Sequence, residues 1–182
     1  MGAVDARPLD PERLGDHLDR LYRAAWALCG SREDAEDLVQ DTYTRVLARP
    51  RMLRSDDDLG YLMSVLRNTF ISRHRTLARR PRTEPFAEGV DPPDERSELR
   101  PDAALEARDV FGVIATLPPD FRDALVAVDV AGLSYREAGK LLGAKEATIT
   151  SRLHRARKQV TQALRGDHES NGGQESPREG VI

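Results

Sequence analysis

The sequence predicts an all-α fold made of two small helical domains joined by a flexible linker. Apolar residues recur at helical spacing in segments that end at glycine or proline, and the middle of the chain is rich in proline. Only 5% of the 182 residues are aromatic and 32% are charged, which is typical of helical units with small cores and broad solvated faces. This length suits one domain or two small ones.

The N-terminal domain, residues 10–80, is predicted to contain three helices, at about 10–29, 31–48 and 59–80. Ser31 can act as the N-cap of the second helix, with Asp34 three residues later in a variant of the capping box. The third helix is apolar in its early turns and strongly basic in its later turns. The residues expected to form the buried stripe of the second helix are Ala35, Leu38, Val39, Thr42 and Val46.

Residues 81–101 are the predicted linker. They include five prolines, one glycine and many charges, with no hydrophobic period. Such a segment cannot pack a core, so we expect it to be flexible. The tail, residues 167–182, is polar and rich in glycine, and we expect it to be disordered.

The C-terminal domain, residues 102–166, is predicted to contain four helices, at about 102–117, 119–130, 134–142 and 145–164. The third of these begins at a capping box formed by Ser134 and Glu137 and ends at Gly143. A short capped helix, a turn containing glycine and a longer basic helix are the signature of a helix-turn-helix, whose second helix enters the major groove of DNA. The C-terminal domain is therefore predicted to contain a helix-turn-helix.

The last predicted helix has an apolar stripe and an opposite basic face. The stripe consists of Ile149, Leu153, Ala156, Val160 and Leu164. On the basic face, arginines can read guanine edges and hydroxyls can bind base edges or phosphates. The candidate readers are Thr148, Ser151, Arg152 and Arg155, and the candidates for phosphate contacts are Arg157 and Lys158. The alternative interpretation is a solvated basic face on an ordinary helical bundle.

Acidic residues stack along one side of the second predicted helix. Glu33, Asp37 and Asp41 are spaced four residues apart, with Gln40 beside them. Like charges at this spacing cost about 0.2–0.5 kcal/mol each, and the helix dipole stabilises only acids in the first turn. Arg45, one turn after Asp41, is the predicted partner of that carboxylate. The pattern indicates either a solvated face or an acidic docking stripe for a basic partner.

The third predicted helix interleaves arginines with side chains that can stack or hydrogen-bond. From Arg67 to Arg82 there are six arginines and no acid, and Asn68, Phe70 and His74 lie among them. This combination suits single-stranded or unpaired DNA, although burial in the core is the alternative interpretation of Phe70. Because charges are segregated in a chain of net charge −3, the sequence indicates at least two kinds of partner.

The N-terminus lacks an apolar segment, and nowhere are about 18 consecutive residues apolar. We therefore predict no signal peptide and no membrane span, and expect a cytoplasmic protein. The single cysteine, Cys29, excludes an internal disulfide and is interpreted as a small core residue. No catalytic residue, metal site or cofactor is predicted.

Three segments resemble the extracytoplasmic-function (ECF) family of bacterial RNA polymerase sigma factors, in the order found in that family. DAEDLVQDTY is similar to the family's core-binding helix and YLMSVLRNTFISRHR to its promoter-melting helix. The segment LPPDFRDALVAVDVAGLSYREAGKLLGAKEATITSRLHRAR is similar to its C-terminal helix-turn-helix. The resemblance covers nearly all of residues 10–165. It implies a sigma region 2-like domain, a flexible linker and a sigma region 4-like domain.

The resemblance also implies roles by position. The residues expected to bind core RNA polymerase, on the coiled coil of its largest subunit, are Asp37, Gln40 and Asp41. Those expected to contact the −10 promoter element are Arg67, Asn68, Arg73, His74 and Arg75. Those expected at the −35 element are Thr148, Thr150, Ser151, Arg152, Arg155 and Lys158. The loop 51–58 is expected to shape a pocket for a flipped base.

The resemblance implies an alternative sigma factor with a role such as a stress response, which binds core polymerase and promoter DNA and is held inactive by an anti-sigma factor. The sequence departs from the usual family pattern at four positions, which bear on the promoter sequence that is read. They are Ser72 in place of aspartate, Gly139 in place of alanine, Ala147 in place of glycine and Thr150 in place of lysine.

Three other functions fit parts of the sequence. A helix-turn-helix regulator that binds operators without polymerase would explain residues 134–165 alone. A carboxylate-dependent nuclease could use Asp34, Asp37 and Asp41, but the sequence offers no partnered general base, phosphate-binding glycine loop or metal-ligand spacing. A purely structural helical adaptor would bind neither DNA nor polymerase.

Overall fold

The computed structural model describes residues 7–9, 11–48, 52–53, 57–79 and 101–171. In this part of the chain the elements are helices and one antiparallel pair of two-residue strands, β1 (Arg7–Pro8) and β2 (Met52–Leu53). The helical elements are a 3-10 helix η1 (Pro11–His17), α1 (Leu18–Cys29), α2 (Arg32–Ala48), α3 (Asp58–Arg79), α4 (Pro101–Thr116), α5 (Pro119–Leu125), a π-helical segment η2 (Val126–Val130), α6 (Tyr135–Leu142) and α7 (Glu146–Asn171). The predicted all-α fold is confirmed.

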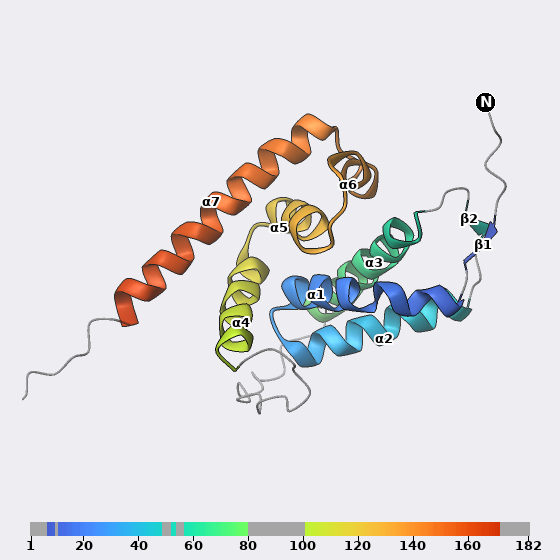
Figure 1. Cartoon of the computed structure of the whole chain (residues 1–182), viewed down its shortest axis with the longest axis horizontal. Coiled ribbons are helices and arrows are strands. Elements are labelled where there is room, and N and C mark those ends of the chain that lie inside the picture. The colour runs from blue at the N-terminus through green and yellow to red at the C-terminus, as the bar shows by residue number, and fades with distance from the viewer. Residues whose placement is uncertain (1–6, 10, 49–51, 54–56, 80–100, 172–182) are drawn as a thin grey trace, which may run out of the picture.

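The N-terminal region packs α1, α2 and α3 together (Figure 1). Gly30 ends α1 in the left-handed conformation, with φ +82°, and its N–H donates to the Trp26 carbonyl at 2.7 Å. Ser31 then accepts the Asp34 N–H at 3.2 Å, which confirms the predicted cap. All residues of the predicted α2 stripe are buried: Ala35, Leu38, Val39, Thr42 and Val46.

The C-terminal region contains the predicted helix-turn-helix. Ser134 and Glu137 form a complete capping box at the start of α6, and Gly143 ends that helix with φ +63°. Pro119 begins α5 at a position where its missing N–H costs nothing. In α7, Ile149, Leu153 and Ala156 are buried, as predicted. Val160 and Leu164 are partly buried.

The last helix is longer than the sequence predicts. α7 continues through Gly166 to Asn171, whereas glycine was expected to end it at about Leu164. An interior glycine costs about 1 kcal/mol relative to alanine in a helix, which weakens the helix without terminating it. The remainder of the predicted tail, residues 172–182, and the predicted linker up to residue 100 lie outside the described residues.

The N-terminal and C-terminal regions pack against each other, although the sequence separates them by a linker. α1 contacts α4 and η2, and α3 contacts α6. In Figure 1, α4 and α5 lie between α7 and the helices of the N-terminal region. The Trp26 ring lies edge-on to the Phe111 ring, with 5.0 Å between their centroids. The buried residues of both regions form one continuous hydrophobic cluster. The observed structure is therefore two helical regions that share a core.

Candidate nucleic-acid and partner interfaces

The acidic stripe predicted on α2 faces solvent. Asp37 and Gln40 are exposed, and Asp41 is partly exposed. Spacing within the helix pairs Asp41 with Arg45, but the ion pair in the structure joins Asp41 to Arg73 of α3. The Arg73 Nε donates to Asp41 Oδ2 at 3.0 Å, and Arg73 Nη2 lies 3.9 Å from Asp37 Oδ2. Exposed ion pairs of this kind contribute only about 0–1 kcal/mol, so either partner can be exchanged.

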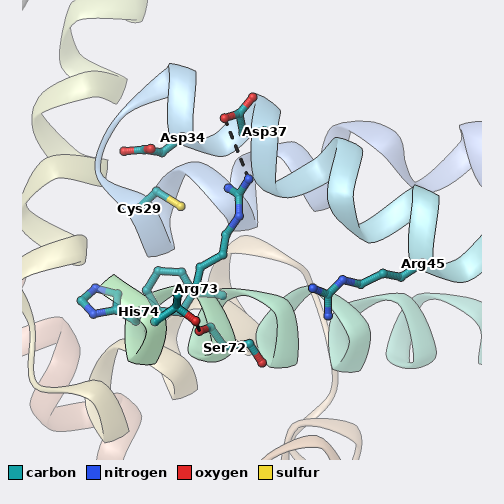
Figure 2. Close-up of a pocket in the computed structure, with 9 residues that line it drawn as sticks. Cys29, Asp34, Asp37, Arg45, Ser72, Arg73 and His74 are labelled. Atoms are coloured by element: carbon teal, nitrogen blue, oxygen red, sulfur yellow. Dashed lines mark hydrogen bonds and ion pairs between the residues drawn. The ribbon is translucent and has the colours of Figure 1, made fainter. Parts of the chain in front are cut away.

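A hollow of about 460 Å³ lies where the end of α1, the start of α2 and the later turns of α3 meet. Arg73 extends across it from α3 toward Asp37 (Figure 2). Its lining residues are Cys29, Asp34, Asp37, Arg45, Phe70, Ser72, Arg73, His74 and Thr76. Burial raises the pKa of the Cys29 thiol to about 12, with a further contribution from Asp34. The thiol is therefore protonated at neutral pH and is not a nucleophile.

Two of the arginines on α3 have carboxylate partners on other elements. Besides the Arg73 pair, Arg67 Nε donates to Asp123 Oδ2 of α5 at 2.7 Å. The Asp123 side chain is 9% exposed and the Arg67 side chain 30% exposed. Asn68, His74 and Arg75 are exposed. The predicted −10 contacts are therefore brought onto one helix, but Arg67 and Arg73 are already engaged.

Phe70 belongs to the core, which was the alternative interpretation from the sequence. It is 6% exposed, and its ring lies 5.2 Å from that of His74 in an edge-on arrangement. The guanidinium of Arg122, from α5, lies over the same ring at 4.9 Å from its centroid. This is a cation–π contact. Sequence reasoning missed Arg122 and Asp123, since nothing near them in the chain signals a partner 56 residues away.

Most of the predicted DNA-reading residues of α7 are exposed. Thr150, Ser151, Arg155 and Lys158 are exposed, and Thr148 is partly buried. The Thr150 and Ser151 hydroxyls donate to the carbonyls of Glu146 and Thr148, at 3.0 Å in both cases. Their lone pairs remain able to accept hydrogen bonds.

Two arginines of α7, the predicted reader Arg152 and the predicted phosphate contact Arg157, are tied to the body of the domain. Arg152 Nη2 donates to Asp120 Oδ2 of α5 at 2.7 Å. Arg157 donates through Nε and Nη2 to the two Asp129 oxygens, at 2.8 and 2.7 Å, which raises the pKa of its guanidinium. Arg157, a candidate for phosphate contacts from the sequence, is thus held within the protein. These pairs fix the orientation of α7 relative to α5 and η2.

Gly139, which departs from the usual family pattern, is explained by the geometry of the turn. A Cβ at this position would lie 2.7 Å from the carbonyl oxygen of Ala144, too close for unstrained packing. The Ala144 N–H also donates to the Gly139 carbonyl at 2.9 Å. The turn between α6 and α7 therefore passes closer to α6 than an alanine would allow.

Within the described ranges, no three His, Cys, Asp or Glu side chains are grouped so as to hold a metal ion. None of the helices that the structure describes combines the length and the apolar character needed to span a membrane. The charged surfaces described above present carboxylates on α2, which suit a basic partner, and cations and hydroxyls on α3 and α7, which suit DNA.

Comparison with known proteins identifies both regions. The family model for Sigma-70 region 2 matches residues 14–80, and that for Sigma-70, region 4 matches residues 107–160. Both matches fall on the helices described above, α1 to α3 and α4 to α7. A regulator that binds operators without polymerase is not supported, because it would leave the region 2 match unexplained.

Relatives cover both regions in one alignment. The ECF RNA polymerase sigma factor SigE of Mycolicibacterium smegmatis is 36% identical over 167 residues, which is 90% of this chain; the match spans 64% of the relative's length. The ECF RNA polymerase sigma factor EcfG of Rhodopseudomonas palustris is 33% identical, with 87% of this chain and 86% of the relative covered.

A solved structure shows the same arrangement of helices. The sigma factor RpoE of Bartonella quintana, in complex with the anti-sigma factor NepR, matches with a TM-score of 0.66 and 28% identity. The match covers 85% of this chain and 95% of that chain. Two family models, relatives that are more than 30% identical over most of this chain, and a shared fold agree. The chain belongs to the ECF family of RNA polymerase sigma factors.

Proposed function

We propose that this protein is an alternative sigma factor, which binds core RNA polymerase and directs promoter-specific initiation by recognising −35 and −10 elements and helping to melt DNA. The observation that carries this proposal is that one chain contains both region 2 and region 4, each with an exposed charged surface of the appropriate sign. The protein acts in the cytoplasm and has no catalytic residues of its own.

In this proposal α2 provides the polymerase-binding surface. Asp37, Gln40 and Asp41 lie on its solvent-facing side, and they match the family's residues for the coiled coil of the largest polymerase subunit. The acids are not needed to balance neighbouring charges in the helix, where like charges four residues apart are unfavourable. A basic partner would turn this cost into a favourable contact.

The two basic helices divide the promoter between them. α7 would enter the major groove at the −35 element with Thr148, Thr150, Ser151, Arg152, Arg155 and Lys158. α3 would engage the −10 element, as it opens, with Arg67, Asn68, Arg73, His74 and Arg75. Since the whole chain has a net charge of −3, binding to DNA depends on polymerase holding both in place rather than on a strong field of the free protein.

An anti-sigma factor is the third proposed partner. The matched RpoE of Bartonella quintana was solved in complex with the anti-sigma factor NepR, and its fold covers most of this chain. We propose that a protein of this class covers the polymerase-binding and promoter-binding surfaces of the present protein when transcription is not required.

The deciding experiment is co-elution of the purified chain with sigma-free core RNA polymerase in gel filtration. The wild-type chain is expected to co-elute, and the double variant Asp37→Ala, Asp41→Ala is expected to lose the complex. The matched control is Asp16→Ala, Asp19→Ala, which removes two exposed acids outside α2 and should co-elute like the wild type. If the wild type forms no complex with active core enzyme, the proposal is wrong.

A further inference from the structure

We propose that, in the free protein, the C-terminal region blocks the promoter-melting helix α3. Asp123 forms an ion pair with Arg67 where a DNA phosphate would otherwise bind, so the docked C-terminal region and melted DNA compete for the same helix. This inference rests on the proposed function of α3 in binding the −10 element. It adds an interaction surface to the protein, whose partner is the chain's own C-terminal region.

The central contact has the geometry of a charge-assisted hydrogen bond. The 2.7 Å between Arg67 Nε and Asp123 Oδ2 joins residues 56 positions apart, from the two regions. The other carboxylate oxygen, Oδ1, lies 3.8 Å from Arg122 Nε. Asp123 therefore presents one negative charge between two guanidinium groups, as a phosphate oxygen would do. Because its side chain is 9% exposed, solvent screens this attraction less than at the surface.

The residue beside Asp123 extends the contact to the core of α3. Arg122 lies over the Phe70 ring, and its Nη1 donates to the Ala115 carbonyl at 3.3 Å. Its Nε, however, is buried and has no hydrogen-bond partner among the described residues. A buried donor without a partner is unfavourable. The docked arrangement is thus stabilised by the contacts of Arg122 with Phe70 and Ala115. It also carries the cost of the buried Arg122 Nε, which opening would relieve.

An apolar seam accompanies the charged contact. Leu28 and Met63 of the N-terminal region and Val126 and Leu141 of the C-terminal region line a gap of only about 10 Å³, next to Arg67 and Asp123. On the other side of the seam, a Cβ at Gly30 would lie 3.0 Å from the Ala115 Cβ. Close packing on both sides shows that the two regions fit each other over a continuous surface.

The position of the seam determines what is blocked. Asn68, His74 and Arg75 are exposed on α3, so a DNA strand can begin to bind there. It can bond to Arg67 Nε only by replacing Asp123. With competition of this kind, the apparent affinity of the free protein for DNA is the affinity of the open form multiplied by the fraction of molecules that are open.

The test uses the full-length isolated chain and two variants. Asp123→Asn removes the charge at the seam with little change of shape. Asp120→Asn is the matched control, because Asp120 lies on the same helix and pairs with an arginine at the same distance, 2.7 Å, but within the C-terminal region. Both variants have the same net charge, and each releases one arginine proposed to contact DNA, Arg152 in the control and Arg67 at the seam. An effect of net charge alone on DNA binding is therefore the same in the two.

Opening is measured as the distance between two spin labels, by double electron–electron resonance. The labels are attached at Glu36→Cys on α2 and Gln162→Cys on α7, two exposed positions, in a Cys29→Ala background. The wild type and Asp120→Asn should show a single short distance, and Asp123→Asn an added longer one. A fluorescent single-stranded 20-nucleotide DNA of mixed sequence is the binding probe. It should bind Asp123→Asn roughly fivefold more tightly than Asp120→Asn, and adding it should lengthen the wild-type distance.

The proposal requires both results. It is overturned if the wild type already shows long distances, if Asp123→Asn remains as closed as Asp120→Asn, or if the probe binds both variants equally, including not at all. Co-elution with core polymerase separates this failure from that of the proposed function. A chain that fails here but co-elutes with core remains a sigma factor without this block, whereas a chain that does not co-elute refutes the proposed function itself.

Discussion

The two basic helices of this protein differ in what their arginines contact. On α7, Arg155 and Lys158 are exposed on the side away from the core. On α3, Arg67 and Arg73 are held by carboxylates of α5 and α2. Of the residues proposed to read duplex DNA, Arg152 is also held, by Asp120 of the same region, but Arg155 and Lys158 can bind without exchanging partners. On the helix proposed to bind melted DNA, Arg67 and Arg73 must exchange partners first. Charge in a sequence indicates a capacity to bind, and packing determines whether that capacity is available.

The largest effect is expected from the substitution Arg155→Ala on α7, which tests whether the exposed arginines of this helix read the promoter. An arginine that reads a guanine is worth about 1–3 kcal/mol of discrimination, so transcription from a cognate promoter should fall by about tenfold or more, while co-elution with core polymerase stays unchanged. Lys158→Ala is the control, and should weaken binding to all DNA sequences alike. Loss of core binding by Arg155→Ala would refute the division of labour between α2 and α7.

The turn that presents α7 can be tested by Gly139→Ala. The new methyl would collide with the Ala144 carbonyl, and overpacking of this kind costs about 1–3 kcal/mol, measured as a fall in the free energy of unfolding in urea. Gly112→Ala, in α4, is the control, since a Cβ there meets nothing within 4 Å and the substitution should be neutral or stabilising. Equal stability of the two variants would show that the turn relaxes freely and does not fix α7.

The seam that covers α3 can be tested by Gly30→Ala. Gly30 and Gly132 both have positive φ, +82° and +77°, so alanine at either should cost about 1 kcal/mol in backbone strain. At Gly30 the methyl would also press on Ala115, whereas at Gly132 it would meet nothing. Gly30→Ala is therefore expected to lower the free energy of unfolding in urea more than Gly132→Ala does. It should also add a longer distance between the two regions in the spin-label measurement. Identical behaviour of the two variants would mean that the seam tolerates the methyl group.

The smallest expected effect concerns the cap of α6, which sets the start of the helix-turn-helix. Ser134→Ala should cost about 1 kcal/mol of stability at pH 7. The Ser134 hydroxyl and its backbone N–H donate to Glu137 Oε2 at 2.6 and 2.8 Å, and these bonds lower the pKa of Glu137 below its ordinary 4.5.

The sign of the pH dependence follows from that lowered pKa. The stabilisation is complete above pH 4.5 and is lost as the pH falls through the lower, folded-state value. The difference between wild type and Ser134→Ala should therefore shrink in acid, as measured by urea unfolding at pH 7 and pH 3. The same stability difference measured for Ser31→Ala, at the cap of α2, shows how a cap in the N-terminal region behaves. A difference at Ser134 that is independent of pH would show that Glu137 does not contribute.

Local features of this fold were predictable from the sequence, and contacts between its regions were not. The buried stripe of α2, the Ser134 capping box and the left-handed Gly143 follow from helical periodicity and backbone chemistry within a few residues, and the structure confirms them. The pairs of Arg67 with Asp123 and Arg73 with Asp41 join residues 56 and 32 positions apart. No period or motif carries such a pairing, because it depends on how finished helices dock.

The proposed linker shows the same limit. Its composition indicated separate domains, which is a statement about the chain between them, but it contained no information on whether the regions would adhere. That depended on Trp26 and Phe111, which any helical core could use. The candidate binding residues lie on α2, α3 and α7, and which of them are paired within the protein became visible only in the assembled structure.

The proposed use of Arg67 by both promoter DNA and Asp123 would constrain how this protein can evolve or be redesigned. A substitution chosen to alter promoter preference at this position also removes a contact that closes the unbound chain. New specificity would thus arrive together with leaky activity, unless a compensating change at Asp123 or Arg122 restored the balance. Engineers who wish to retarget the factor should vary Asn68 or Arg75, which are exposed, and leave the shared guanidinium in place.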